Sequence, residues 1–178
     1  TDDSLHSRCF RDTTQRTDGR TLQTKDGKEG RADRRKERGC EQRRMAVDVL
    51  SANDLSALMM DAKEKMKDIV IVDVRDHDYK GGNIKGSINV PSMTFGALIG
   101  QLTKEYNDKK MVVFHCMYSQ QRGPRAATAF ADSMKKNYPS SKCKIAYLRG
   151  GFAGWANLYV GHKNQNQLIE NLDIKMWA

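Results

Sequence analysis

Short apolar runs and helical stripes alternate along the chain from residue 45 onward. Apolar runs bounded by polar sequence are typical of buried strands, whereas apolar residues three and four apart are typical of amphipathic helices. The strands predicted in this way are 47–49, 69–72, 87–90, 111–115 and 144–148. The helices predicted after them are 55–66, 95–106, 123–137 and 150–159. Ser51, followed by Asp54, resembles a capping box before the first helix.

The alternation of strands with helices predicts an α/β fold. Its central sheet is mostly parallel, has five strands, and is flanked by helices on both faces, which makes three layers. We expect this domain to cover residues 45–162. In open parallel sheets, reactive groups gather at the carboxyl ends of the strands. Asp73, Cys116 and Arg149 all fall at such ends.

The segment from Met111 to Arg125 carries the strongest chemical signal. Its strand delivers His115 and Cys116 to a loop that ends at Arg122, and Gly-Pro then precedes a helix-forming stretch. A loop wrapped around a helix N-terminus points several backbone N–H groups into one concavity, and the helix dipole adds partial positive charge. The sequence therefore predicts a site for a tetrahedral oxyanion.

Cys116 and Arg122 would give this site its reactivity. The field of the loop favours the thiolate of a cysteine at its base, and an arginine can grip two oxygens of the anion. Together they would perform covalent catalysis on phosphate-like groups. Because a cysteine and an arginine six apart also occur by chance, the alternative is that Cys116 is only a small buried residue. The strand before it and the helix after it favour the reactive cysteine.

Residues 1–44 differ in composition from the rest. They hold six hydrophobic residues, 13 Lys or Arg and 9 Asp or Glu, so their net charge is 13 − 9 = +4 of the total +9. This stretch is predicted to be a disordered, mixed-charge basic arm. Nucleic-acid binding is not favoured, because the charges are mixed in sign and lack interleaved aromatic residues. Met45, which follows the arm, is a candidate initiator.

The cysteines, Cys9, Cys40, Cys116 and Cys143, indicate a reducing compartment. They form neither a Cys-x2-Cys pair nor a Cys/His cluster with metal-ligand spacing, so we expect no metal site and no disulfide framework. No apolar stretch is long enough to cross a membrane. The expected location is the cytoplasm, with the nucleus as the alternative.

Two further segments carry predictions of their own. The polar stretch 76–82 is predicted to be a surface turn in which His77 and the neighbouring carboxylates are solvated and bind no metal. The tail, 163–178, is predicted to pack its apolar residues on its own domain, with partner binding as the alternative. Those residues are Leu168, Ile169, Leu172, Ile174, Met176 and Trp177.

The stretch IVDVRDHDYKGGNIKGSINVP, followed by VVFHC and LRGGFAGW, resembles the rhodanese-like domain over about residues 45–160. Sulfur-transferring rhodaneses usually have a six-residue active loop, whereas HCMYSQQRGPR has seven residues from the cysteine to the arginine. The longer loop is similar to that of the M-phase inducer phosphatases and of the related fungal, plant and protozoan arsenate reductases. The resemblance implies a cradle wide enough for phosphate or arsenate.

The resemblance also implies roles for individual residues. Cys116 would be the nucleophile and Arg122 the oxyanion clamp. His115 would tune Cys116, while Asp73 and Arg75 would support the site structurally. The cradle would consist of the main-chain N–H groups of Met117, Tyr118, Ser119, Gln120, Gln121 and Arg122.

Some positions depart from the family pattern. Met117 and Gln121 stand where cell-cycle phosphatases tend to carry acidic residues, so a general acid or base within the loop is not expected. Val74 replaces a second cysteine that can form a protective disulfide in those enzymes. Residues 161–178 contain no cysteine, so the zinc-binding tail of some plant relatives is not expected.

The resulting expectation is a cysteine-dependent arsenate or antimonate reductase with phosphatase activity of the tyrosine or dual-specificity type. It would hold no bound cofactor, and glutathione or glutaredoxin would be the external reductant. Its partners would be arsenate, a phosphate ester or a phosphoprotein, and glutaredoxin. The alternatives are a protein phosphatase of the M-phase inducer type, a rhodanese sulfurtransferase, and a non-catalytic rhodanese binding module.

Overall fold

The structure, a computed structural model, describes residues 45–61 and 65–177. The prediction of a disordered arm at 1–44 lies outside these residues. The main sheet has five strands in the order β1-β6-β5-β2-β4, and every pair of neighbours is parallel. The strands are β1 (Val47–Leu50), β2 (Ile69–Asp73), β4 (Ile88–Asn89), β5 (Met111–His115) and β6 (Lys144–Leu148). The predicted five-stranded parallel sheet is confirmed.

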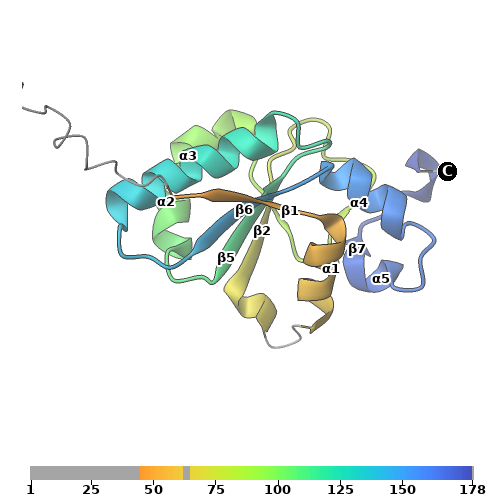
Figure 1. The fold of residues 1–178 in the computed structure, drawn as a ribbon. Helices are drawn as coiled ribbons and strands as arrows, with labels where there is room; N and C mark the ends of the chain where they lie inside the picture. Colours follow the sequence, from red (N-terminus) through yellow and green to blue (C-terminus); the bar gives the residue numbers. More distant parts are fainter. Residues whose placement is uncertain (1–44, 62–64, 178) are drawn as a thin grey trace, which may run out of the picture. The chain divides into compact units, whose positions relative to one another are not determined.

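Helices cover both faces of this sheet (Figure 1). One face carries α2 (Ser92–Tyr106) and α3 (Arg122–Asn137), and the other carries α1 (Ala52–Asp61), α4 (Gly151–Tyr159) and α5 (Gln165–Leu168). Alternating side chains of each strand separate two cores. In β5, Val112 and Phe114 join the core under α2 and α3, whereas Val113 joins the core under α1 and α4.

The start of α1 follows the predicted capping box. The Asp54 N–H donates to Ser51 Oγ at 3.2 Å, and the Ser51 N–H donates to Asp54 Oδ2 at 3.3 Å. The prediction of an α-helix as far as residue 66 differs from the structure, since positions 65 and 66 belong to the 3-10 helix η1 (Lys65–Asp68), whereas α1 is described as far as Asp61. No helix in the described part of the chain is both long and apolar enough to cross a membrane.

The C-terminal tail packs on the domain, as predicted for most of its apolar residues. Its strand β7 (Ile169–Glu170) pairs antiparallel with β3 (Asn83–Ile84), two short elements that the sequence did not predict. Leu168 and Ile169 are buried in the core under α1 and α4. In the 3-10 helix η2 (Ile174–Met176), Ile174 and Met176 are more than half exposed, so the prediction is wrong for Ile174, whereas Met176 still lies against Gly81.

Candidate active site

The loop 116–121 joins the central strand β5 to α3 at the carboxyl edge of the sheet. Cys116 opens the loop and is 4% exposed, while Arg122 is the first residue of α3. Pro124, in the first turn of α3, fits there because that turn needs no N–H from it. The strand, loop and helix predicted from the sequence are therefore present, and the helix begins at Arg122, one residue before its predicted start.

A backbone N–H group of the loop contacts the sulfur of Cys116. The Ser119 N–H donates to Cys116 Sγ at 3.2 Å, and the positive φ of Ser119, 50°, turns the chain back over the cysteine. Several other N–H groups of the loop have no hydrogen-bond acceptor among the described residues. They are those of Met117, Tyr118, Gln120 and Gln121. The loop therefore holds unused donors, as a cradle for an anion requires.

The amino end of α4 fixes the back of this loop. The Phe152 N–H donates to the Cys116 carbonyl at 2.9 Å, and the Ala153 N–H donates to the Met117 carbonyl at 2.8 Å. Because a trans peptide points its C=O and N–H in opposite directions, these bonds turn the N–H groups of Met117 and Tyr118 away from α4. The α4 helix thus helps to orient the cradle.

Arg122 is bound by two aspartates of the loop 76–82. Arg122 Nη1 donates to Asp76 Oδ2 at 3.0 Å and to Asp78 Oδ1 at 2.8 Å, and Nη2 donates to Asp78 Oδ2 at 2.5 Å. The prediction that the carboxylates of this loop are solvated is therefore wrong for both aspartates, because they face the arginine. His77, between them, is exposed, as predicted.

The ion pairs shift the protonation of their partners. Hydrogen bonds from Arg122 lower the pKa of Asp78 to about 2, although burial opposes the shift. Burial alone would raise the pKa of Asp76. Hydrogen bonds from Ser92 and Arg122 outweigh this effect, so the pKa of Asp76 lies below its ordinary value. The bonds to Asp78 raise the pKa of Arg122. All three groups are therefore charged at neutral pH.

Asp73 and Arg75 form a fully buried ion pair behind the cysteine. Arg75 Nε and Nη2 lie 2.8 and 2.7 Å from Asp73 Oδ2. Arg75 Nη2 also donates to the Gly82 carbonyl at 2.8 Å, and its guanidinium carbon lies 4.3 Å from the centre of the Phe152 ring. The pair therefore ties the end of β2 to the loop 76–82 and to α4, a contact pattern suited to support of the site.

His115 lies beside this ion pair and directly before Cys116. Burial lowers its pKa, while the Asp73 carboxylate opposes the shift, so the imidazole is neutral at pH 7. Nδ1 lies 3.4 Å from the Cys116 carbonyl and Nε2 lies 3.7 Å from Asp73 Oδ2. Within the described residues, Nε2 is the one buried side-chain nitrogen or oxygen without a hydrogen-bond partner.

The chain is similar to known proteins of one family. The model of the rhodanese-like domain matches residues 51–158. The chain belongs to the rhodanese-like domain family. It is 36% identical over 122 residues to dual specificity phosphatase ibp1 of Schizosaccharomyces pombe, covering 60% of this chain and 86% of that protein. It is 37% identical over 124 residues to arsenate reductase 2.1 of Oryza sativa subsp. japonica, covering 68% and 76%.

A solved structure shares the fold of this rhodanese-like domain. It is Ygr203w, described as a yeast protein tyrosine phosphatase of the rhodanese family, with a TM-score of 0.61 and 29% identity over 74% of this chain and 97% of that chain. The named relatives are thus enzymes of two kinds, phosphatases and arsenate reductases.

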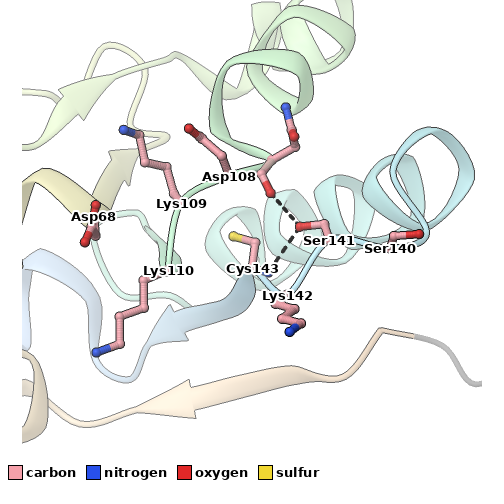
Figure 2. A pocket seen from close by; sticks show the side chains of 9 residues that line it. Asp68, Asp108, Lys109, Lys110, Ser140, Ser141, Lys142 and Cys143 are labelled. Atoms are coloured by element: carbon pink, nitrogen blue, oxygen red, sulfur yellow. Dashed lines mark hydrogen bonds between the residues drawn. The ribbon is translucent and has the colours of Figure 1, made fainter.

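Cys143, the other cysteine among the described residues, lies far from the loop 116–121. It precedes β6 and lines a cavity of about 440 Å³ at the amino ends of the strands (Figure 2). There Ser141 Oγ donates to the Asn107 carbonyl and accepts from the Cys143 N–H. Burial raises the pKa of the Cys143 thiol to about 11. Because Cys116 follows β5 at the carboxyl edge, the two sulfurs are separated by the length of a strand.

Asp76, Asp78 and the amino end of α4 are the parts of the site that sequence reasoning missed. The aspartates follow Asp73-Val74-Arg75 directly, so acidic residues beside the Asp-x-Arg element were the available signal. Within the described residues, no group of three or more His, Cys, Asp or Glu side chains is arranged to hold a metal ion.

Proposed function

We propose that this rhodanese-like domain is a cysteine-dependent oxyanion enzyme, an arsenate or antimonate reductase that also hydrolyses aryl phosphates. One observation carries the proposal: the Ser119 N–H donates to Cys116 Sγ, several other amides of the same loop have no acceptor among the described residues, and Arg122 begins the helix that follows. Fixed donors of this kind stabilise negative charge as it develops on a tetrahedral anion. The named relatives, phosphatases and arsenate reductases, support the same two chemistries.

In the phosphatase reaction, the Cys116 thiolate attacks phosphorus and the bond from phosphorus to the ester oxygen breaks. The loop amides and Arg122 hold the three remaining oxygens. The phosphocysteine that results is hydrolysed by water, which regenerates the thiolate and releases phosphate. This route needs a proton for a poor leaving group, and the ionised Asp78 has none to give at neutral pH.

In the arsenate reaction, the thiolate attacks arsenic and one oxygen departs as water, with protons that arsenate itself carries. A glutathione thiolate then attacks Cys116 Sγ. The electron pair of the sulfur–arsenic bond goes to arsenic, which leaves as arsenite, and a mixed disulfide remains. A second thiol, from glutathione or glutaredoxin, reduces that disulfide. The distant Cys143 makes an external thiol the suitable reductant.

Among the described residues, Asp76 and Asp78 beside Arg122 are ionised at neutral pH and have no proton to give, which favours this order of activities over the alternatives. A protein phosphatase of the M-phase inducer type must expel a poor alkoxide or phenoxide, which requires a general acid. A sulfurtransferase would carry a persulfide on Cys116, for which the seven-residue loop is longer than usual. A non-catalytic binding module would not need Cys116 and Arg122 together.

Three assays on the purified protein test the proposal. They are glutathione- and glutaredoxin-dependent arsenate reduction, para-nitrophenyl phosphate hydrolysis, and sulfur transfer from thiosulfate to cyanide. We expect arsenate reduction and slow phosphate hydrolysis, because nitrophenolate leaves without a proton. Cys116→Ser should abolish both, since it removes the nucleophile.

Cys143→Ser is the matched control, because it changes the other described cysteine far from the loop. It should keep both activities within about twofold, as expected for a substitution remote from the reacting atoms. Strong sulfur transfer without the other two activities would overturn the proposal. So would arsenate reduction that survives Cys116→Ser.

A further inference from the structure

We propose that Asp76 and Asp78 are positioning residues that hold Arg122 so that one edge of its guanidinium faces the anion in the loop. The inference rests on the proposed function, because it assigns the two carboxylates to the same oxyanion site. It differs from the role of the loop amides, since neither carboxylate can bind an anion itself. Both would act through the arginine.

The hydrogen bonds of Arg122 leave one edge of the guanidinium unused. Three of its five N–H groups donate to the aspartates: both on Nη1 and one on Nη2. The remaining two, on Nε and Nη2, point in the same direction along the opposite edge. Two parallel N–H groups are the fork with which arginine grips two oxygens of a phosphate-like anion. The carboxylates thus leave the binding edge open.

The aspartates are themselves held rigidly. Asp76 accepts from Ser92 Oγ at 2.7 Å and from the Met93 N–H at 3.2 Å, at the amino end of α2. The Asp76 N–H donates to Asp78 Oδ1 at 3.0 Å, so each aspartate restrains the other. The buried Arg75 fixes the far end of the same loop through the Gly82 carbonyl. A flexible arginine is therefore bound to a fixed support.

This support matters because the side chain of Arg122 has several rotatable bonds and is 31% exposed. Without partners it would sample many rotamers, and few of them would direct the fork into the loop. Positioned groups accelerate a reaction when they fit the transition state without further reorganisation. The carboxylates would therefore act mainly on kcat.

Their effect on anion binding should be different. Each carboxylate is a negative charge close to the site, so its removal makes the site more attractive to an anion. A positioning role thus predicts lower kcat without weaker anion binding. An inhibitory role, in which the aspartates withhold Arg122 from substrate, predicts that their removal raises both.

The test compares Asp78→Asn and Asp76→Asn with the parent protein. We expect kcat for arsenate reduction and for para-nitrophenyl phosphate to fall about ten- to a hundredfold in Asp78→Asn, because an amide has one acceptor oxygen and no charge where the carboxylate accepts two of the three hydrogen bonds from Arg122. The inhibition constant of inorganic sulfate should rise no more than about threefold, because the lost carboxylate also removes repulsion. Asp78→Glu, which keeps the charge, should recover part of kcat.

His77→Asn is the matched control, because this exposed residue lies between the two aspartates. It should leave kcat unchanged, and thermal melts should show each variant folded at the assay temperature. Parent-level kcat in folded Asp78→Asn would overturn the proposal. A rise in kcat, or a loss of sulfate binding equal to the loss of kcat, would also overturn it.

A measurement without turnover separates this inference from the proposed function. The rotation of the Arg122 guanidinium can be followed by nuclear magnetic resonance of its Nε–H and Nη–H groups in Cys116→Ser protein. We expect slow rotation, and fast rotation once Asp78→Asn is added. If the parent enzyme shows no activity but this difference is present, the proposed function fails and the positioning of Arg122 stands. Fast rotation with both aspartates in place would refute the positioning.

Discussion

Gly151, the first residue of α4, lies against the backbone of the active loop. Its φ is +58°, and a Cβ built there would lie 2.4 Å from the Cys116 carbonyl oxygen and 2.5 Å from that of Met117. Both carbonyls accept hydrogen bonds from the next residues of α4. A side chain at this position would therefore push against the loop that carries the cysteine.

Gly151→Ala should destabilise the protein and distort the loop. We expect a loss of about 2–4 kcal/mol in the free energy of unfolding, from the strained left-handed conformation and the overlap with backbone atoms. Urea unfolding measures it, and arsenate reduction should fall as well. Gly154→Ala is the matched control in the same helix, because its Cβ would lie 3.9 Å from the nearest atom, the Arg149 oxygen. Equal stability of the two variants would contradict this interpretation.

Asp78 should make the stability of the fold depend on pH. Its pKa falls from 3.8 to about 2 on folding, so its contribution is complete above about pH 4 and disappears as the pH falls through 2. At pH 7, Asp78→Asn should lower the free energy of unfolding by about 1–2 kcal/mol, a range reduced for solvent screening of a side chain that is 24% exposed.

The measurement is urea unfolding of the parent and Asp78→Asn between pH 3 and 7. The difference between the two should shrink toward the acid end. Asp132→Asn, at an exposed position on α3, is the control and should change the free energy of unfolding by less than about 0.5 kcal/mol. A difference that is constant over the range would show that Asp78 stabilises the fold without its charge.

The residues of the site differ in how far the sequence reveals them. The positions of Cys116 and Arg122 at the two ends of one loop were predictable, because the apolar strand before the loop and the Gly-Pro after it lie in one local segment. The contacts of Arg122 with Asp76 and Asp78 join positions 46 and 44 residues apart, which no local pattern shows. From sequence alone, a polar loop is predicted to be solvated, because the charged residue that it contacts elsewhere in the fold is not known.

Among the elements, the long apolar strands were predicted best. β2, β5 and β6 are apolar enough to be recognised without their partners. β3 and β7 have two residues each, too few for any period, so only their pairing defines them. The apolar stripe of α1 continues in phase beyond Asp61, and periodicity alone does not mark where the hydrogen bonding changes.

At the scale of the whole molecule, the C-terminal tail contacts and supports the loop 76–82, which carries Asp76 and Asp78. The indole N–H of Trp177 donates to the Gly81 carbonyl at 2.7 Å, and its ring lies 5.4 Å from that of Phe152, edge to face. Phe152 in turn packs on Arg75. Trp177, at the end of the described chain, therefore holds the loop 76–82 from its outer side. The buried Arg75 holds the same loop from its inner side.

Trp177→Ala should loosen this loop. We expect a loss of about 1–3 kcal/mol in the free energy of unfolding, from one hydrogen bond and the apolar contact of the indole, and faster amide exchange in residues 79–83. Ile174→Ala is the control, because that side chain is 60% exposed and should matter by less than about 0.5 kcal/mol. Unchanged exchange in Trp177→Ala would mean that the loop does not depend on the tail.

The separation of Cys116 from Cys143 affects how the Cys116 thiol would respond to oxidation. A thiolate attacked by peroxide becomes a sulfenic acid, which a neighbouring thiol can trap as a disulfide before further oxidation destroys it. Among the described residues no second thiol is near Cys116, since Val74 occupies the adjacent strand end and Cys143 lies at the opposite edge. The described domain therefore supplies no partner thiol for an oxidised Cys116, and within it a small thiol from the solution would have to form the protective disulfide.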